Sequence, residues 1–359
     1  MKALITAGGR ATRLRPITTT INKHLIPLGG RPMLWQAISK VAECGIKEIA
    51  VNVNVGETEI QKACGDGSRW GVKLTYLEQQ GGPKGLAHII KNARPFLGDE
   101  PFVFYLGDNI ILGSIRGFVE KFRSSGVNGL LALAKVHDPQ RFGVPVIVDG
   151  RIVRVEEKPA RPQSDFAVTG IYVYDKSVHQ AVDAIQPSAR GEYEISDVHT
   201  WLIEHGFAVG YEEITGWWKD TGKPEDLVEG NQLILDEMTD KEAQIEGEVA
   251  PEARIIGRVK LGAGSRVLGR SVIEGPANIG SNCIITDSRL GPHVSIGDGS
   301  RISGADIRHS VLFDGVTVNT QHPIADSLIG REVTLKPAAS EEKAVRLVVG
   351  DCSVVEVGG

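Results

Sequence analysis

Cysteine and long apolar runs are both scarce in this sequence. The 359 residues include only four cysteines, and none stands in a C-x-x-C pair, so neither a zinc site nor a disulfide framework is expected. No stretch approaches the roughly 18 consecutive apolar residues of a membrane-spanning helix, and the apolar run after Met1 is too short for a signal peptide. The sequence therefore predicts a cytoplasmic protein with reduced thiols and no membrane partner.

An excess of positive charge is missing as well. Lysine and arginine total 40 against 45 aspartate and glutamate residues, for a formal net charge of −5. Nucleic-acid binders generally depend on a broadly basic surface, so no nucleic-acid partner is expected, although small basic pockets for phosphate remain compatible with this balance. The hydrophobic share of 41% suits a globular core, and the length suggests two domains or one large domain with an appendage.

Arrangements for nucleophilic catalysis are also absent. No Ser-His-Asp or Cys-His constellation stands out, and the nine histidines show no HExxH spacing. Glycine, in contrast, is abundant at 43 residues, which exceeds its usual share. Many of these glycines follow predicted strands, where turns are expected.

The first half of the chain alternates between strand and helix patterns. Strands separated by helical stretches of this length predict βαβ units and a mostly parallel, Rossmann-like α/β sheet with helices on both faces. The helix that begins at Gly85 is expected to close at Pro95. Strands are predicted at 2–7, 48–55, 72–77, 102–106, 130–136, 144–148, 152–155, 168–174 and 207–212. Helices are predicted at 32–44, with Pro32 as the first helical residue, and at 57–64, 85–93, 177–185, 195–204 and 225–238.

The second half carries a hexapeptide repeat. A six-residue apolar period is typical of a parallel β-helix, in which each coil stacks its apolar corners on the next. We therefore predict two domains, a catalytic domain over 1–242 and a β-helix over 243–359, with two closing strands within 344–357. The period slips by one residue in three places, before Leu290, Ile307 and Leu312. The apolar positions of the repeat are Val249, Ile255, Leu261, Val267, Ile273, Ile279, Ile285, Leu290, Ile296, Ile302, Ile307, Leu312, Val318 and Ile324.

A glycine turn follows the first predicted strand. Gly8 and Gly9 let backbone N–H groups approach an anion closely, and the arginines after them, Arg13 among them, add charge-assisted hydrogen bonds. This pattern suits a triphosphate, although it is neither a Walker A loop nor a GxGxxG motif. The alternative is a plain strand-to-helix connection with solvated arginines.

Acidic residues occupy two places where a metal could bind. Asp108 ends a predicted central strand, at the sheet edge where open α/β sheets hold ligands. Asp220 lies far downstream, and Mg²⁺ typically takes one or two carboxylates and fills its other positions with phosphate oxygens and water. Either aspartate alone could equally be a turn or helix-cap residue. Glu157 and Lys158 could bind a sugar hydroxyl and a sugar phosphate together, but alone they are read as a surface charge run, and Lys23 is a similarly weak signal.

Taken in order, these segments resemble the sugar-nucleotide pyrophosphorylases, and most of all the longer glucose-1-phosphate thymidylyltransferases with a C-terminal left-handed β-helix. The resemblance covers the catalytic segment to about residue 240 and extends through the repeats. Its motifs are Gly8-Gly9, Thr12-Arg13-Leu14, Lys23, Pro27, Gly65-Asp66-Gly67-Ser68-Arg69-Trp70-Gly71, Gln80, Gly85-Leu86-Ala87-His88, Leu106-Gly107-Asp108-Asn109, Phe142-Gly143-Val144, Glu157-Lys158-Pro159, Val168-Thr169-Gly170-Ile171-Tyr172, Ala189-Arg190-Gly191-Glu192, Lys219-Asp220-Thr221-Gly222 and Leu347-Val348-Val349-Gly350-Asp351.

The resemblance implies a reaction in which a sugar 1-phosphate, glucose 1-phosphate, attacks the α-phosphorus of dTTP and pyrophosphate leaves. By the family pattern, Arg13 grips the β- and γ-phosphates and Lys23 neutralises the phosphate region. Asp108 and Asp220 would hold Mg²⁺. The nucleoside would lie against Gly8, Gly9, Gln80 and Gly85, and the sugar phosphate against Lys158, Glu157, Gly143, Val168 and Arg190, with Arg190 bracing that site.

One departure from the family pattern concerns the phosphate loop. Ala11 stands where the family usually has glycine, and Arg10 stands where it has a small residue. If that position has positive φ, Ala11 would cost about 1 kcal/mol or reshape the turn, and Arg10 could contact phosphate or face solvent.

Two other functions stay open on the sequence alone. A sister enzyme could use UTP or another sugar phosphate, because thymine differs from uracil by one methyl group, worth only about 1–3 kcal/mol in a pocket. A non-catalytic paralogue that binds nucleotide sugars is the third possibility. A homo-oligomer is expected, with the β-helix packing against the catalytic domain or another subunit.

Overall fold

The computed structural model describes residues 1–9, 11–214 and 218–337. The chain divides into two compact units, of which the first combines Met1–Arg10 with Leu34–Asp220 and the second combines Ala11–Met33 with Thr221–Gly359. The chain thus passes between the units after residue 10, after residue 33 and after residue 220. The domain boundary at 242/243 stays a prediction, since the compact units divide elsewhere.

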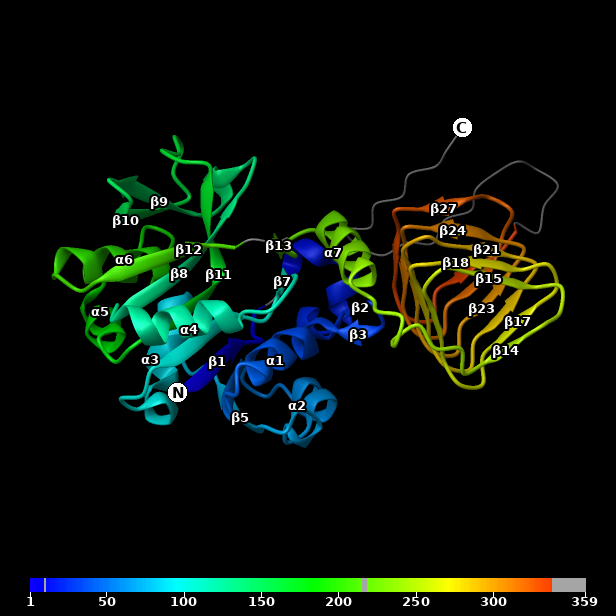
Figure 1. The fold of residues 1–359 in the computed structure, drawn as a ribbon, viewed down its shortest axis with the longest axis horizontal. Helices are drawn as coiled ribbons and strands as arrows, with labels where there is room; N and C mark the ends of the chain where they lie inside the picture. Colours follow the sequence, from blue (N-terminus) through cyan, green and yellow to red (C-terminus); the bar gives the residue numbers. More distant parts are fainter. Residues whose placement is uncertain (10, 215–217, 338–359) are drawn as a thin grey trace. The chain divides into compact units, whose positions relative to one another are not determined.

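The first unit is built on a seven-stranded sheet (Figure 1). Its order is β12-β8-β11-β6-β1-β4-β5, and β11 runs antiparallel to both of its neighbours while the other pairs are parallel. The central strands are almost continuously buried, as expected for strands covered on both faces. The strands are β1 (Lys2–Thr6), β4 (Glu48–Val53), β5 (Lys73–Glu78), β6 (Phe102–Leu106), β8 (Gly129–Lys135), β11 (Phe166–Tyr174) and β12 (Val209–Glu213).

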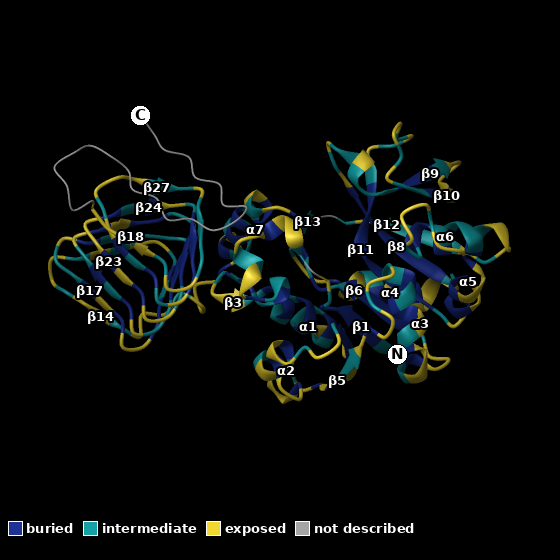
Figure 2. Ribbon diagram, turned by 180° about the vertical axis from the view of Figure 1, so that it is seen from behind, coloured by how far each residue is buried: buried dark blue, intermediate teal, exposed yellow. Residues whose placement is uncertain are grey.

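Helices connect the strands, and all but α4 (Arg116–Ser125) correspond to helical patterns predicted from the sequence. Three of them, α3, α5 and α6, pack on one another and share an apolar core with the sheet, whose buried strands β8 and β11 are dark blue in Figure 2. Two expectations were wrong. Pro32 is not the first helical residue, because it pairs with Pro27 in a short hairpin and α1 begins at Met33. Pro95 lies inside α3, which continues to Leu97 because that side chain is fully buried in the core. The helices are α1 (Met33–Glu43), α2 (Glu59–Cys64), α3 (Leu86–Leu97), α4 (Arg116–Ser125), α5 (Val178–Ala184), α6 (Ile195–Glu204) and, in the second unit, α7 (Pro224–Asp236).

Two antiparallel ribbons complete the first unit. β9 (Gly143–Val148) pairs with β10 (Arg151–Glu157), and β7 (Asn109–Ile111) pairs with β13 (Trp218–Asp220). The second ribbon brings the end of the unit's chain back to the strand that follows β6.

The second unit contains the predicted β-helix. Its strands form three parallel sheets, and the predicted repeat residues stack in register, as in the column Ile255, Ile273, Leu290, Ile307 and Ile324. Side chains of these columns fill a continuous apolar core. The predicted closing strands within 344–357 lie outside the described residues. The first sheet comprises β14 (Glu248–Val249), β17 (Arg266–Leu268), β20 (Ile284–Thr286), β23 (Arg301–Ser303), β26 (Thr317–Asn319) and β29 (Thr334–Leu335). The other two comprise β15 (Arg254–Ile256), β18 (Val272–Glu274), β21 (Arg289–Leu290), β24 (Asp306–Arg308) and β27 (Ile324–Ala325), and β16 (Val259–Leu261), β19 (Ala277–Ile279), β22 (Val294–Ile296), β25 (Val311–Leu312) and β28 (Leu328–Ile329).

Beside the β-helix, the second unit holds α7 and the segment 11–33. That segment consists of three short 3-10 turns followed by a small hairpin, β2 (Pro27–Leu28) with β3 (Arg31–Pro32).

Cys44, Cys64 and Cys283 are free and buried, and burial raises the pKa of Cys44 and Cys64 to about 11. None of the helices in the described ranges is long and apolar enough to cross a membrane.

Candidate active site

The carboxyl ends of β1 and β6 form the natural ligand edge of the sheet. The chain moves from β1 outward to β4 and β5 and then returns to β6 on the other side of β1, and such a reversal is where open α/β sheets bind ligands. Gly8 follows β1 and Asp108 follows β6. The N–H of Gly107 donates to the carbonyl and the hydroxyl of Thr6, at 3.0 and 3.2 Å, which ties the two strand ends together.

Amide side chains line the turn after β1. The side chain of Asn54 makes two hydrogen bonds to the backbone of Gly9. Its Oδ1 accepts from the N–H at 3.0 Å, and its Nδ2 donates to the carbonyl at 3.2 Å. A Cβ on Gly8 would lie 3.3 Å from Nδ2 of Asn52, which is 1% exposed and has no hydrogen-bond partner in the described part of the chain. Gln79 is buried beside them. Sequence reasoning missed these three residues, although Asn52 and Asn54 alternate on one face of a predicted strand.

Asp108 directly precedes β7 in the middle of the first unit's sequence, and Asp220 ends that unit in the paired strand β13. Asp220 lies directly opposite Asn109 in the β7–β13 pair, and Asp108 immediately precedes Asn109. The amide of Asn109 donates to Asp108 Oδ1 at 3.0 Å, and its Oδ1 accepts from the indole N–H of Trp218 at 2.7 Å. Both aspartates are half-buried. No cluster of three or more His, Cys, Asp or Glu ligands occurs among the described residues.

A charged network surrounds Glu157. One of its oxygens accepts from Ser196 at 2.7 Å, and the other faces Arg190 at 3.1 Å and Lys158 at 3.3 Å. Arg190 also binds both oxygens of the buried Glu194, at 3.2 and 2.9 Å. Partial burial works against the charged guanidinium, but the hydrogen bond to Glu194 and the negative charges of Glu194, Glu157 and Glu192 together raise the pKa of Arg190. The network therefore holds a carboxylate and two cations in one place.

Local backbone geometry positions this network. Gly143 lies opposite Glu157 in the β9–β10 pair, and a Cβ on Gly143 would come within 2.8 Å of Ser196 Oγ. Lys158 has φ +45°, and its N–H donates to Phe142 at 2.9 Å. Val168 is buried in β11, just before an irregularity in its pairing with β8.

Gln80 and Gly85 flank the loop between β5 and α3. Gln80 is exposed, and its carbonyl accepts from Asn92 at 3.4 Å. Gly85 has φ +96°, and a Cβ there would lie 2.5 Å from the carbonyl oxygen of Tyr193. Only glycine therefore fits at the start of α3.

Arg13 and Lys23 belong to the second unit, so their place beside the residues above stays a prediction. Arg13 is exposed in the 3-10 turn Thr12–Leu14, and Lys23 is half-buried in the turn Lys23–Leu25. Ala11 has φ +42° and ψ +40°, so the positive φ considered from the sequence is present. Arg10 lies outside the described residues.

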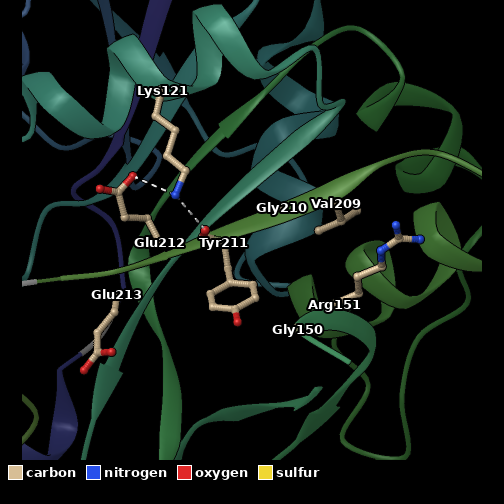
Figure 3. Close-up of a pocket in the computed structure, with 8 residues that line it drawn as sticks. All are labelled: Lys121, Gly150, Arg151, Val209, Gly210, Tyr211, Glu212 and Glu213. Carbon is tan, nitrogen blue, oxygen red and sulfur yellow. Dashed lines mark hydrogen bonds and ion pairs between the residues drawn. The ribbon is translucent and has the colours of Figure 1, made fainter. Parts of the chain in front are cut away.

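A pocket of about 430 Å³ lies at the β12 edge of the sheet (Figure 3), and none of the predicted site residues lines it. Its Lys121 contacts the carboxylate of Glu212 and the carbonyl of Tyr211, both at 3.3 Å. The lining residues are Lys121, Gly150, Arg151, Val209, Gly210, Tyr211, Glu212 and Glu213.

Comparison with known proteins assigns the family. A family model described as nucleotidyl transferase matches residues 2–237. The chain is 42% identical to a glucose-1-phosphate thymidylyltransferase of Streptomyces antibioticus, over 99% of both chains. It is 39% identical to the low-salt glycan biosynthesis nucleotidyltransferase of Haloferax volcanii, over 99% of this chain and 100% of that protein.

A solved structure agrees with these relatives. A crystal structure from Bacillus anthracis, assigned as a glucose-1-phosphate thymidylyltransferase, is 38% identical with a TM-score of 0.63, and it covers 67% of this chain and 96% of its own. The α/β sheet, the β-helix and the full-length relatives all agree with the resemblance noted from the sequence. The chain therefore belongs to the nucleotidyl transferase family and is a nucleotidyltransferase.

Proposed function

We propose that this nucleotidyltransferase forms dTDP-glucose and pyrophosphate from dTTP and glucose 1-phosphate. The observation that carries the proposal is the pairing of Asp220 with Asn109, since it sets two carboxylates at one end of the sheet. The Glu157–Lys158–Arg190 network supports a second, sugar-phosphate subsite in the same unit. The names of the relatives from Streptomyces antibioticus and Bacillus anthracis support the choice of substrates.

The reaction needs no protein nucleophile. A phosphate oxygen of glucose 1-phosphate attacks the α-phosphorus of dTTP, and the bond from that phosphorus to the bridging oxygen of the β-phosphate breaks. The electron pair leaves with pyrophosphate. Catalysis is then a matter of positioning and charge neutralisation. Arg13 and Lys23 neutralise the leaving pyrophosphate and the phosphate region, Lys158 holds the sugar phosphate, and Glu157 accepts from sugar hydroxyls.

Asp108 and Asp220 are the residues that would hold Mg²⁺. Two carboxylates at one strand edge match the one or two that Mg²⁺ usually takes from a protein, with phosphate oxygens and water completing its shell. The bound ion would supply positive charge to the triphosphate. Asn109 orients Asp108 through its amide hydrogen bond, and Trp218 fixes Asn109 in turn.

A second candidate uses UTP or another sugar phosphate. The full-length relative from Haloferax volcanii is named as a glycan-biosynthesis nucleotidyltransferase, and its name states no sugar. Relatives that match the whole chain therefore carry names with different biosynthetic roles.

A substrate panel separates the two. Pyrophosphate release is measured with Mg²⁺ for dTTP and UTP against several sugar 1-phosphates, and kcat/KM is compared. We expect the highest value for dTTP with glucose 1-phosphate. A higher kcat/KM for UTP, or for another sugar phosphate, would replace the first assignment with the second.

A further inference from the structure

Within the second unit, one buried amide joins three separate segments. Asn231 of α7 is 0% exposed. Its Oδ1 accepts from the N–H of Gly29 at 2.9 Å and from the hydroxyl of Ser295 at 2.6 Å, and its Nδ2 donates to the carbonyl of His293 at 3.3 Å. Gly29 lies in the turn between β2 and β3, and the other two partners lie on the β-helix. Asn231 therefore links the segment 11–33 to the β-helix through α7.

The turn that Asn231 holds fits closely against its neighbours. Gly29 and Gly30 both have positive φ, at +59° and +76°. A Cβ on Gly29 would lie 2.4 Å from Cγ2 of Ile234 on α7, and a Cβ on Gly30 would lie 2.1 Å from Nδ2 of Asn278 on β19. No side chain can be added at this turn without displacing it, so its place on α7 and the β-helix is tightly specified.

The segment fixed in this way carries the cations predicted to act on the triphosphate. Lys23 lies in the 3-10 turn immediately before β2, and the N–H of Met33 donates to Ile26 at 3.1 Å, which closes the hairpin behind it. Farther up the segment, Ile17 reaches the β-helix, since its Cδ1 would be 3.5 Å from a Cβ on Gly330. The part of the chain from Arg13 to Met33 thus packs against α7 and the β-helix at several points.

We propose that α7 and the β-helix position Arg13 and Lys23 for nucleotide binding, with Asn231 as the central positioning residue. The inference rests on the proposed function, because it takes these cations to contact the triphosphate. It assigns the C-terminal repeats a part in the reaction itself. Loss of Asn231 should weaken nucleotide binding and turnover and leave the sugar-phosphate subsite, which belongs to the first unit, largely unchanged.

The test compares two substitutions at this position in the full-length chain. Asn231→Leu removes all three hydrogen bonds, whereas Asn231→Asp keeps the acceptor for Gly29 and Ser295. For Asn231→Leu we expect a rise of roughly tenfold in KM for dTTP and a lower kcat, with KM for glucose 1-phosphate within about twofold of wild type. Asn231→Asp should recover much of the loss. A wild-type KM for dTTP in folded Asn231→Leu would overturn the proposal.

Hydrogen–deuterium exchange supplies a readout that does not depend on turnover. Amides of residues 24–33 should lose protection in Asn231→Leu. Failure of the proposed function would be seen separately, because the wild-type protein would then not turn over dTTP with glucose 1-phosphate. In that case the kinetics of the variants are measured with the nucleotide that the substrate panel identifies. If residues 24–33 stay protected in Asn231→Leu, Asn231 does not hold this segment in place, whichever substrate the enzyme uses.

A milder pair of variants covers the case in which Asn231→Leu does not fold. Ser295→Ala removes one hydrogen bond to Asn231. Ser310→Ala is its matched control, a buried serine whose hydrogen bonds to Arg308 and Ser327 stay within the β-helix. Ser295→Ala should raise KM for the nucleotide and Ser310→Ala should not. Equal kinetics in the two variants would reject the positioning role.

Discussion

Gly170 and Asn109 are packed so closely that neither can change without the other. The N–H of Gly170 donates to Asn109 Oδ1 at 3.2 Å, and a Cβ on Gly170 would lie 2.6 Å from Cγ of the same side chain. Because Asn109 also binds Asp108 and Trp218, this glycine in β11 controls the geometry around both candidate metal ligands.

Gly170→Ala should therefore displace Asn109 and impair turnover. We expect a loss of about 1–3 kcal/mol in the free energy of unfolding from overpacking, together with a fall in kcat. Gly117→Ala is the control, because nothing lies within 4 Å of a Cβ at that exposed helix position, and it should stabilise by at most about 1 kcal/mol. Denaturant unfolding and steady-state kinetics check both; unchanged kcat in Gly170→Ala would contradict the role given to Asn109.

Asp108→Asn should abolish most turnover while the protein stays folded. Asp108 is one of the two carboxylates that would hold Mg²⁺, and loss of charge stabilisation by the ion is expected to lower kcat by roughly 10²–10³-fold. The exposed Asp99→Asn serves as the control for a change of one charge. Circular dichroism checks the fold and pyrophosphate release the rate. Wild-type rates in Asp108→Asn would refute the metal assignment, and chelation of Mg²⁺ should stop the wild-type enzyme.

Ser196→Ala should weaken the sugar-phosphate subsite selectively. The hydroxyl donates to Glu157 at 2.7 Å, and without it Glu157 loses one of the groups that orient it toward the sugar. We expect KM for glucose 1-phosphate to rise roughly tenfold, equivalent to about 1.4 kcal/mol, with KM for dTTP nearly unchanged. Ser125→Ala on α4 is the control. An equal rise in both KM values would point to a general loss of structure instead.

The buried pair Tyr174 and His199 should make the fold sensitive to acid. They share a 2.6 Å hydrogen bond, and burial lowers the pKa of His199 to about 3. The unfolded chain binds this proton near pH 6.5, so the stabilisation is complete above pH 6.5 and is lost progressively as pH falls from 6.5 toward 3. Between pH 6.5 and 5 the loss should approach about 2 kcal/mol.

The double variant Tyr174→Phe with His199→Phe removes the titrating group and its partner together. Its unfolding free energy, measured in denaturant at pH 7 and pH 5, should fall less on acidification than that of wild type. An identical fall in both proteins would assign the acid sensitivity to other residues.

The strands, helices and repeats could be predicted from the sequence because each leaves a local periodic signal. Apolar columns such as Ile273, Leu290 and Ile307 follow directly from the six-residue spacing. Pro95 was misjudged because a helix-breaking residue was weighed without the burial of Leu97, which favours another turn of helix.

The site could be predicted only as a set of separate motifs. The amides of Asn52, Asn54 and Gln79 act through contacts with Gly8 and Gly9, which are distant in sequence and leave no spacing pattern. The same applies to Asn231, since nothing in the sequence around it indicates that Gly29 and Ser295 are its partners. The roles of Arg13 and Lys23 still rest on the resemblance.

The interleaved path of the chain constrains how this protein can be cut. A fragment ending at residue 242 keeps α7 and the hairpin β2–β3 but discards Ser295, His293 and Asn278. It would leave Asn231 with only Gly29 among its three partners and open the β-helix side of α7 to water. Anyone shortening the chain to its family-matching portion must therefore redesign that helix face with polar residues to keep the fragment from associating.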